Sequence, residues 1–391
     1  MKKLIFSTLA LCLLMSSCSN NLLNGQLGDE TDEGAVLALT DSALIKAPRL
    51  AAQDIRKIVS EEPLVYGTNV QVFESYAAFD STINLIEEMQ PAKLKVWAQE
   101  HNIENEIIES NVVYDSVFQQ IGKQNGLQFD SDGMIIEPKL FIGNTPGRLD
   151  KIFAYEKALE QTLDDFDIVM HELYPQYIHE FTDSLGNHFI ESLGAPNEDI
   201  FKNDKNLYVI DSEVHRTYPD GAITCAFSDY KKIARFGTVR EINQFINREG
   251  GVAMLSAQFE IKRHSQYQKR ILSGIGYDKN SKHAMQASFS IAVSKAIFGL
   301  DRRSMRVLVT NYSKNKKGNF VMKSWKTNLK ASFATTAVGG ADHTFTFDHK
   351  NCWMRNRQFT HSIYKSSAGD VYITSFNALV ESSGLQISGV K

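Results

Sequence analysis

Residues 285–294 read MQASFSIAVS, and this stretch decides how the second half of the chain folds. Apolar side chains occupy every second position, and mostly Gln and Ser lie between them. Because a strand turns successive side chains to opposite faces of a sheet, this period of two predicts a strand with one buried face and one solvated face. The same alternation recurs in three further places, at Met305, Val307 and Val309, at Phe345 and Phe347, and at Val371 and Ile373.

Turn-forming residues separate these expected strands. Clusters rich in Gly, Ser, Asn, Asp and Lys lie at residues 317–319, 339–342, 366–370 and 382–384. Such spacing is typical of an antiparallel meander or sandwich, so we expect a β-rich region over residues 201–391. Residues 238–247 have a more helical pattern, which leaves a mixed domain as an alternative.

The residues before 200 follow a helical pattern. Between residues 69 and 90 the apolar side chains recur at steps of three or four, which is the stripe of an amphipathic helix. Pro91 suits the first turn of a second helix, which we expect to end near residue 101. Further helices are expected within residues 35–60, 106–121 and 149–170, so residues 35–200 are predicted to be mainly helical and the fold class to be α+β.

The predicted helical hairpin carries a family resemblance. Residues 72–101 read VFESYAAFDSTINLIEEMQPAKLKVWAQEH, and this segment resembles an N-terminal helical element of uncharacterised lipoproteins of the Bacteroidetes group. Those proteins have a Phe-centred helix, a Met near its end and a Trp in the next helix, and Phe79, Met89 and Trp97 occupy these places here. The resemblance covers 30 residues, and it implies a location and an organisation rather than an activity.

The first eighteen residues have the features of an export signal. Lys2 and Lys3 precede a largely apolar run over residues 4–15, which is too short to span a bilayer as a helix. Two Ser residues then precede Cys18, a pattern that resembles a lipobox. We therefore expect residues 1–17 to be a signal peptide and Cys18 to be lipidated, so that acyl chains hold the protein in a membrane. The alternative is an ordinary secretory signal with an incidental Cys.

The residues that follow Cys18 predict a tether. Residues 19–34 are polar, contain Gly and are acidic, so they cannot bury enough apolar surface to fold alone. Residues 18–34 are thus expected to be a lipidated Cys and a flexible linker, and no Asp follows Cys18 directly. By the sorting rule for outer-membrane lipoproteins, this predicts an outer-membrane lipoprotein that faces either the periplasm or the cell surface.

Charge divides the chain into two halves. Residues 19–200 contain 32 acidic against 11 basic residues, whereas residues 201–391 contain 14 against 29. Basic residues gather near aromatic ones in the second half, which favours binding of an anionic glycan or an acidic protein partner. Two alternatives stay open, because strands need solvated polar faces and because the acidic half can face the basic half. The residues that we expect to bind the ligand are Arg302, Arg303, Arg306, Trp353, Arg355 and Arg357.

Cysteines and histidines offer weaker signals. Cys225 and Cys352 would remain after export, and they either form a disulfide or stay as two buried thiols. A metal site is a hypothesis for His171, His179, Asp183 and His188, although two of these His residues are eight apart, unlike the one-turn spacing of zinc proteases. The alternative is a pair of exposed His residues at a helix end followed by a polar turn. A second His and Asp group comprises Asp342, His343, Asp348 and His349.

Recognisable catalytic motifs are missing from the sequence. It has no nucleophile elbow, no phosphate-binding loop and no dinucleotide fingerprint, and it indicates no cofactor. The leading prediction is a non-enzymatic envelope or surface binding module for a glycan or anionic ligand. A hydrolase that acts on glycans or peptides, metal-assisted or not, is the first alternative, and a structural or assembly component is the second. Specific nucleic-acid binding is not expected of a lipid-tethered protein outside the cytoplasm.

Overall fold

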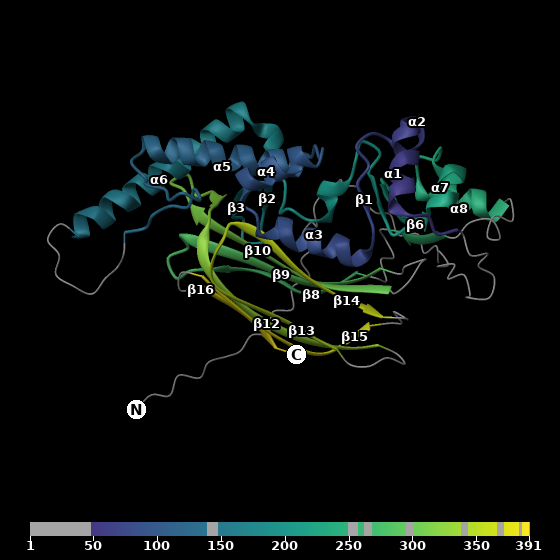
Figure 1. The fold of residues 1–391 in the computed structure, drawn as a ribbon. Coiled ribbons are helices and arrows are strands. Elements are labelled where there is room, and N and C mark those ends of the chain that lie inside the picture. The colour runs from purple at the N-terminus through teal and green to yellow at the C-terminus, as the bar shows by residue number, and fades with distance from the viewer. Residues whose placement is uncertain are drawn as a thin grey trace. The chain divides into compact units, whose positions relative to one another are not determined.

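Three β-sheets and the helices that pack on two of them make up the part of the chain that the structure describes (Figure 1). The structure is a computed structural model, and its described residues all belong to one compact unit, Val36–Lys391. It combines helices with strands that lie mostly in the C-terminal half, so the predicted α+β class is confirmed. The described residues are 48–138, 148–248, 257–261, 268–294, 301–337, 343–365, 371–382 and 385–390.

The N-terminal helices follow the apolar stripes of the sequence. Helix α3 (Tyr76–Glu88) begins where the Ser75 side chain accepts a hydrogen bond from the Ala78 amide at 3.1 Å, which caps its first turn. Helix α4 begins at Pro91, as predicted, because proline suits the first turn of a helix. The other helices of this part are α1 (Ala52–Glu61), α2 (Pro63–Tyr66), α4 (Pro91–Glu100), α5 (Glu106–Gln124) and α6 (Arg148–Leu173).

The start of the expected helix over residues 69–90 is wrong. Asn69 has a φ of 53°, a left-handed conformation that interrupts a right-handed helix. The next residues extend as strand β1 (Val72–Phe73), which pairs in parallel with β4 (Leu207–Ile210). A stripe of apolar residues therefore runs through a strand before it enters the helix.

The first sheet has helices on both faces. Val209 of β4 belongs to a core cluster with residues of α1, α2, α7 and α8, whereas its neighbour Ile210 packs with α3 and α4. Since neighbouring strand residues point to opposite faces, these two clusters cover the two faces of the sheet. The sheet has the order β1-β4-β5-β6-β7. Its further elements are β5 (Glu213–Tyr218), β6 (Gly221–Ala226), α7 (Phe227–Ile233), α8 (Val239–Arg248) and β7 (Ala257–Ile261).

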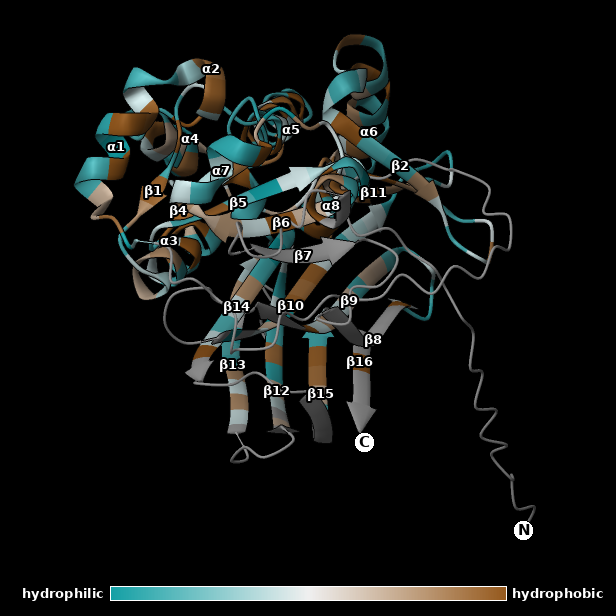
Figure 2. Cartoon of the chain, turned by 90° about the vertical axis from the view of Figure 1, so that its right-hand side faces the viewer, coloured by the Kyte–Doolittle hydropathy of each residue, from teal (hydrophilic) through white to brown (hydrophobic). Residues whose placement is uncertain are grey.

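The other two sheets form a sandwich. One has the order β2-β3-β11-β10-β9-β8, with β14 also paired to β10, and the other has the order β13-β12-β15-β16. A single core cluster takes residues from both sheets, such as Phe289 and Val307 from the first and Leu329 and Phe345 from the second. Figure 1 shows the two sheets as layers, and Figure 2 shows apolar and polar bands along their strands. The strands are β8 (Gln268–Tyr277), β9 (His283–Ser294), β10 (Asp301–Lys314), β11 (Phe320–Met322), β12 (Trp325–Ala337), β13 (His343–Met354), β14 (Asn356–Lys365), β15 (Val371–Ser382) and β16 (Leu385–Val390).

Arg355 marks the place where the chain passes from one sheet of the sandwich to the other. Met354, just before it, pairs with Trp325 in the β12–β13 ladder. Asn356, just after it, pairs with Thr310 of β10 in the opposite sheet. The bend at Arg355 therefore joins two long strands at a corner of the sandwich, and this corner positions the candidate site.

Residue 200 does not separate the sheets of the protein. The hairpin of β2 (Ile178–Thr182) and β3 (His188–Ser192) extends the sandwich sheet, since β3 pairs in parallel with β11. Helices α5 and α6 pack against this extension through a cluster that contains Phe166, Phe189 and Phe320. The two regions predicted on either side of residue 200 thus share strands and cores.

Several predicted features lie outside the described residues. They are the signal peptide over residues 1–17, Cys18 with its linker, Asp342 and the turn clusters over residues 339–342 and 366–370. Among the residues that the structure does describe, no helix combines the length and the apolar character that crossing a bilayer requires.

Candidate functional site

Two of the predicted ligand-binding arginines pair with carboxylates of the protein itself, and of these Arg302 is buried and Arg306 is half-buried. Arg302 on β10 donates from Nε to both carboxylate oxygens of Asp80 on α3, at 3.0 and 3.2 Å, and its side chain is 4% exposed. Arg306 donates from Nη2 to Glu198 at 2.7 Å. Burial raises the pKa of Glu198, but the nearby guanidinium groups of Arg306 and Arg302 outweigh it and lower that pKa to about 2.

The prediction that Arg302 and Arg306 bind an external anion is therefore corrected. Their charges neutralise acidic residues of the N-terminal half. This is the second alternative given above, in which the acidic half of the chain faces the basic half. Buried guanidinium groups need such carboxylate partners, because an unpaired charge inside a protein is strongly unfavourable. For Arg303 only the backbone lies within the described part of the chain.

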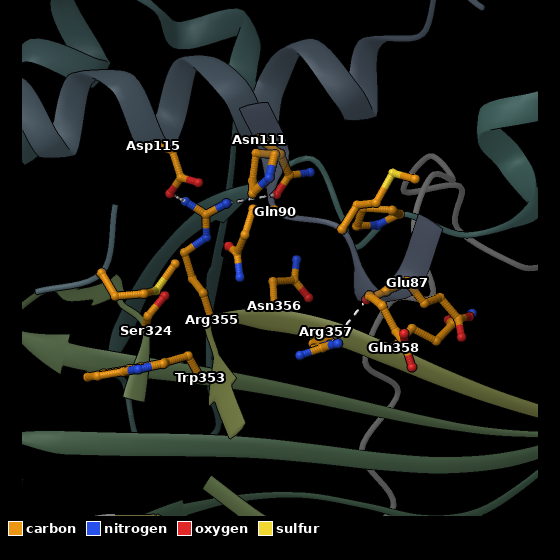
Figure 3. Close-up of a pocket in the computed structure, with 15 residues that line it drawn as sticks. Glu87, Gln90, Asn111, Asp115, Ser324, Trp353, Arg355, Asn356, Arg357 and Gln358 are labelled. Atoms are coloured by element: carbon orange, nitrogen blue, oxygen red, sulfur yellow. Dashed lines mark hydrogen bonds and ion pairs between the residues drawn. The ribbon is translucent and has the colours of Figure 1, made fainter. Parts of the chain in front are cut away.

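The other three predicted residues come together. Trp353, Arg355 and Arg357 line one pocket, which lies between the α3–α4 junction, α5 and the corner at Arg355 (Figure 3). The pocket is partly open to solvent. Its lining residues are Glu87, Glu88, Met89, Gln90, Pro91, Asn111, Asp115, Met134, Pro196, Ser324, Trp353, Arg355, Asn356, Arg357 and Gln358.

Arg355 is held in place by α5. One Nη atom forms an ion pair with Asp115, and the other donates to the Asn111 side-chain oxygen at 3.2 Å. The guanidinium carbon also lies 5.1 Å from the centroid of the Tyr114 ring, within the range of a cation–π contact. Burial raises the pKa of Asp115, although Arg355 opposes this rise. Arg355 therefore lines the pocket in a fixed position, and Asp115 balances its positive charge.

Glu87 ties the end of α3 to strand β14. Its carboxylate accepts hydrogen bonds from the Thr360 amide at 2.9 Å, the Thr360 hydroxyl at 2.6 Å and the Gln358 amide nitrogen at 3.1 Å. Arg357 donates from Nε to the Glu87 carbonyl oxygen at 3.1 Å. Burial raises the pKa of Glu87 to about 7, against the lowering effect of the hydrogen bonds from Thr360 and Gln358.

This raised pKa predicts a pH-dependent stability that the Glu87→Gln variant lacks. Because the folded-state pKa of Glu87 lies above its unfolded value, its contribution to stability is lost as the pH rises from about 4.5 to about 7. The loss is on the order of 3 kcal/mol. Chemical denaturation at several pH values should show E87Q gaining stability relative to wild type over this range.

The comparison has to be made as a difference between the two proteins. Burial lowers the pKa values of His215 and His283 to about 4, so their contributions change in the opposite direction over the same pH range. Both histidines are present in wild type and in E87Q, and their effects cancel in the difference. A stability difference that stays constant from pH 4.5 to pH 7.5 would contradict the assignment of Glu87.

Several polar groups of the pocket have no hydrogen-bond partner among the described residues. They include the side-chain amide of Gln90, the Asn356 Nδ2 group, both Nη atoms of Arg357 and the indole N–H of Trp353. The Lys326 ammonium lies 5.4 Å from the centroid of the Trp353 ring, and Trp353 is one of the residues that line the pocket. The site therefore combines an aromatic side chain with hydrogen-bonding groups that can serve a ligand.

The predicted metal ligands are divided between different places. His171, at the end of α6, and His188, on β3, both contact the carboxylate of Glu180, the latter at 3.5 Å. His171 Nδ1 also lies 2.9 Å from Asp167. Each of the two imidazoles therefore has the Glu180 carboxylate as a partner.

His179 and Asp183 are turned elsewhere. His179 precedes Glu180 on β2 and so faces the other side of the strand, where its Nδ1 lies 3.1 Å from Glu191. Asp183 accepts hydrogen bonds from backbone amides within the β2–β3 turn, including that of Asn187 at 2.8 Å. The hypothesis of one metal site is thus corrected: within the described part of the chain, no group of three or more His, Cys, Asp or Glu side chains could hold a metal ion.

The remaining predicted sites also stay apart. Cys225 is buried in the core of the first sheet and Cys352 packs against the core of the sandwich, so both are free thiols rather than a disulfide. In the second His and Asp group, His349 stacks on Phe359 with ring centroids 4.1 Å apart, and Asp348 lies 3.8 Å from the Lys350 ammonium.

Sequence reasoning missed the half of the pocket that α3 and α4 contribute. Glu87, Gln90 and Pro91 belong to the helical hairpin that the sequence predicts, but nothing in their spacing indicates contact with residues some 270 positions later. Pro91 is the one local signal, because it places a helix break where polar side chains can turn toward the strands.

Comparisons with known proteins give no relative. No protein-family model matches the chain, and neither a curated protein nor a solved structure is significantly similar to it.

Proposed function

We propose that this protein is a non-enzymatic binding module of the bacterial envelope, and that the pocket at the corner between β13 and β14 binds a saccharide. The observation that carries this proposal is the pocket itself, where Trp353 meets the unpaired side-chain groups of Gln90, Asn356 and Arg357. In small-molecule sites a few convergent polar groups fix the orientation of the ligand.

A sugar ring suits these groups. It presents C–H groups on one face, which pack against an aromatic ring, and hydroxyl groups at its edge, which exchange hydrogen bonds with amides and guanidinium groups. The walls are ordered before any ligand binds, because Arg355 is fixed by Asp115 and the end of α3 is fixed by Glu87. A site that is already ordered loses less conformational entropy on binding, which favours affinity.

The pairing of the carboxylates supports binding rather than hydrolysis. Glycoside hydrolysis needs two carboxyl groups that reach the scissile bond. In this pocket Asp115 is paired with Arg355, and Glu87 uses both oxygens on Thr360 and Gln358. Glu88 is exposed and forms no hydrogen bond or ion pair among the described residues, and its charge favours the protonated form of His349.

Attachment to the outer membrane through a lipidated Cys18 is part of the same proposal. The support comes from the order of the cationic, apolar and small residues that precede Cys18. Cells that express the full chain should incorporate labelled palmitate into the wild-type protein and not into the Cys18→Ala variant. Equal labelling of the two would overturn the anchor without affecting the pocket.

Replacing Trp353 with Ala should abolish most saccharide binding. The chain from residue 19 onward retains every described element, and it can be titrated calorimetrically with saccharides chosen from a glycan array. Loss of a central aromatic contact in a pocket costs about 2 kcal/mol or more, so the dissociation constant of W353A should rise about 30-fold or more.

Trp97→Phe is the matched control, because Trp97 of α4 stacks on His101, just after this helix, and does not line the pocket. W97F should bind as wild type does. Undiminished affinity in W353A would place the saccharide elsewhere, and the absence of saccharide binding in the wild-type protein would overturn the proposed function.

A further inference from the structure

We infer that the saccharide carries a carboxylate and that Arg357 binds this group. The inference rests on the proposed function and narrows it to acidic sugars such as uronic acids. The arginines that lie where the helices meet the sandwich differ in their partners. Arg302, Arg306 and Arg355 each form an ion pair with a carboxylate, whereas Arg357 contacts no carboxylate among the described residues.

The guanidinium group of Arg357 is held by a hydrogen bond from its Nε atom, and its two Nη atoms remain available to a ligand. Its Nε donates to the Glu87 carbonyl oxygen at 3.1 Å, and its central carbon lies 5.1 Å from the centroid of the Phe359 ring. Both Nη atoms then have no partner within the described part of the chain, and Figure 3 shows this side chain between Asn356 and Glu87. Two parallel N–H groups match the two oxygens of a carboxylate.

The other unpaired groups near Arg357 are mostly hydrogen-bond donors. The Asn356 oxygen accepts from the Thr310 hydroxyl at 3.2 Å, which directs the Nδ2 group away from that bond. The indole N–H of Trp353 can only donate. The Gln90 amide supplies two further N–H donors and one acceptor oxygen. A ligand rich in acceptor oxygens, as an acidic sugar is, satisfies this set best.

The two cations of the lining differ in their partners. Asp115 balances Arg355, whereas Arg357 forms no ion pair among the described residues. The Glu87 carboxyl, whose pKa burial raises to about 7, is partly protonated at neutral pH. A phosphate monoester carries about −1.5 to −2 at neutral pH, more than one guanidinium group balances. The charge of Glu88 is exposed to solvent and therefore screened, so it opposes an anion only weakly.

Matched pairs of sugars test this inference. Oligosaccharides of glucose and of glucuronate, and of galactose and of galacturonate, would be titrated into the chain from residue 19 onward. Wild type should bind the acidic member about tenfold more tightly or better, since a hydrogen-bonded ion pair adds more than a neutral hydrogen bond. Arg357→Gln should lose the acidic preference and bind both members with similar affinity. Arg240→Gln removes the same charge from an exposed position on α8 and should retain the preference.

The outcomes separate the inference from the proposed function. Equal binding of neutral and acidic sugars by wild type would overturn the inference and leave the saccharide site standing. An acidic preference that survives in R357Q would overturn the role of Arg357. If no sugar of either kind binds, the proposed function fails and the inference fails with it.

Discussion

Replacing Arg302 with Met is expected to lower the free energy of unfolding by about 3–5 kcal/mol. The Arg302 side chain is 4% exposed and forms an ion pair with Asp80, whose side chain is 12% exposed. Without the guanidinium group, the Asp80 carboxylate would be left in the interior beside α3 with its main counter-charge removed. Chemical denaturation of R302M, compared with wild type at neutral pH, measures this loss.

The double variant Asp80→Leu with Arg302→Met distinguishes an unpaired charge from a general packing defect. Apolar replacement of both partners of a buried ion pair is often neutral or even stabilising. We therefore expect the double variant to recover most of the stability that R302M loses, while Arg306 stays paired with Glu198. If the double variant is less stable than R302M alone, the buried pair does not explain the effect.

Replacing Phe189 with Ala is expected to cost about 3–5 kcal/mol as well, because removal of a buried Phe leaves a cavity. Phe189 is fully buried on β3, and its ring lies between those of Phe181 and Phe320, with centroids 4.8 and 5.0 Å away. This residue also pairs with Phe320 where β3 joins β11. The variant thus tests whether residues before 200 share a core with the sandwich.

Phe153→Ala is the control for this second prediction. Phe153 lies on α6 and is 63% exposed, so its replacement should change the free energy of unfolding by less than about 0.5 kcal/mol. The account predicts one cooperative transition for both variants. A Phe189→Ala protein in which only part of the structure unfolds at lower denaturant would contradict a core shared by the two halves.

The sequence predicts those parts of the fold that local periodicity determines. The alternation at residues 285–294 lies within β9, and the stripe that contains Phe79 and Ile83 lies within α3. Periodicity cannot show which strands pair over long distances. The parallel pairing of Phe189 with Phe320 joins residues more than a hundred positions apart, and it is why the predicted division at residue 200 misses the shared sheet.

In the candidate site, too, the sequence does not show which distant residues a side chain contacts. Trp353, Arg355 and Arg357 alternate along one short segment, so the sequence groups them and the structure places them in one pocket. Arg302 and Arg306 look equally basic in sequence, yet their carboxylate partners Asp80 and Glu198 are distant in the chain. Whether an arginine faces a ligand or an internal carboxylate depends on such distant partners.

Hydrogen–deuterium exchange of the wild-type protein, with and without a bound saccharide, locates the binding site. We expect slower exchange at residues 353–358 and at residues 87–91, the two segments that contribute most of the pocket lining. The first sheet and its helices α1 and α8 should exchange as they do in the free protein. Protection at α1 or α8, or around His171 and His188, with no change at residues 353–358, would contradict the assignment of the pocket.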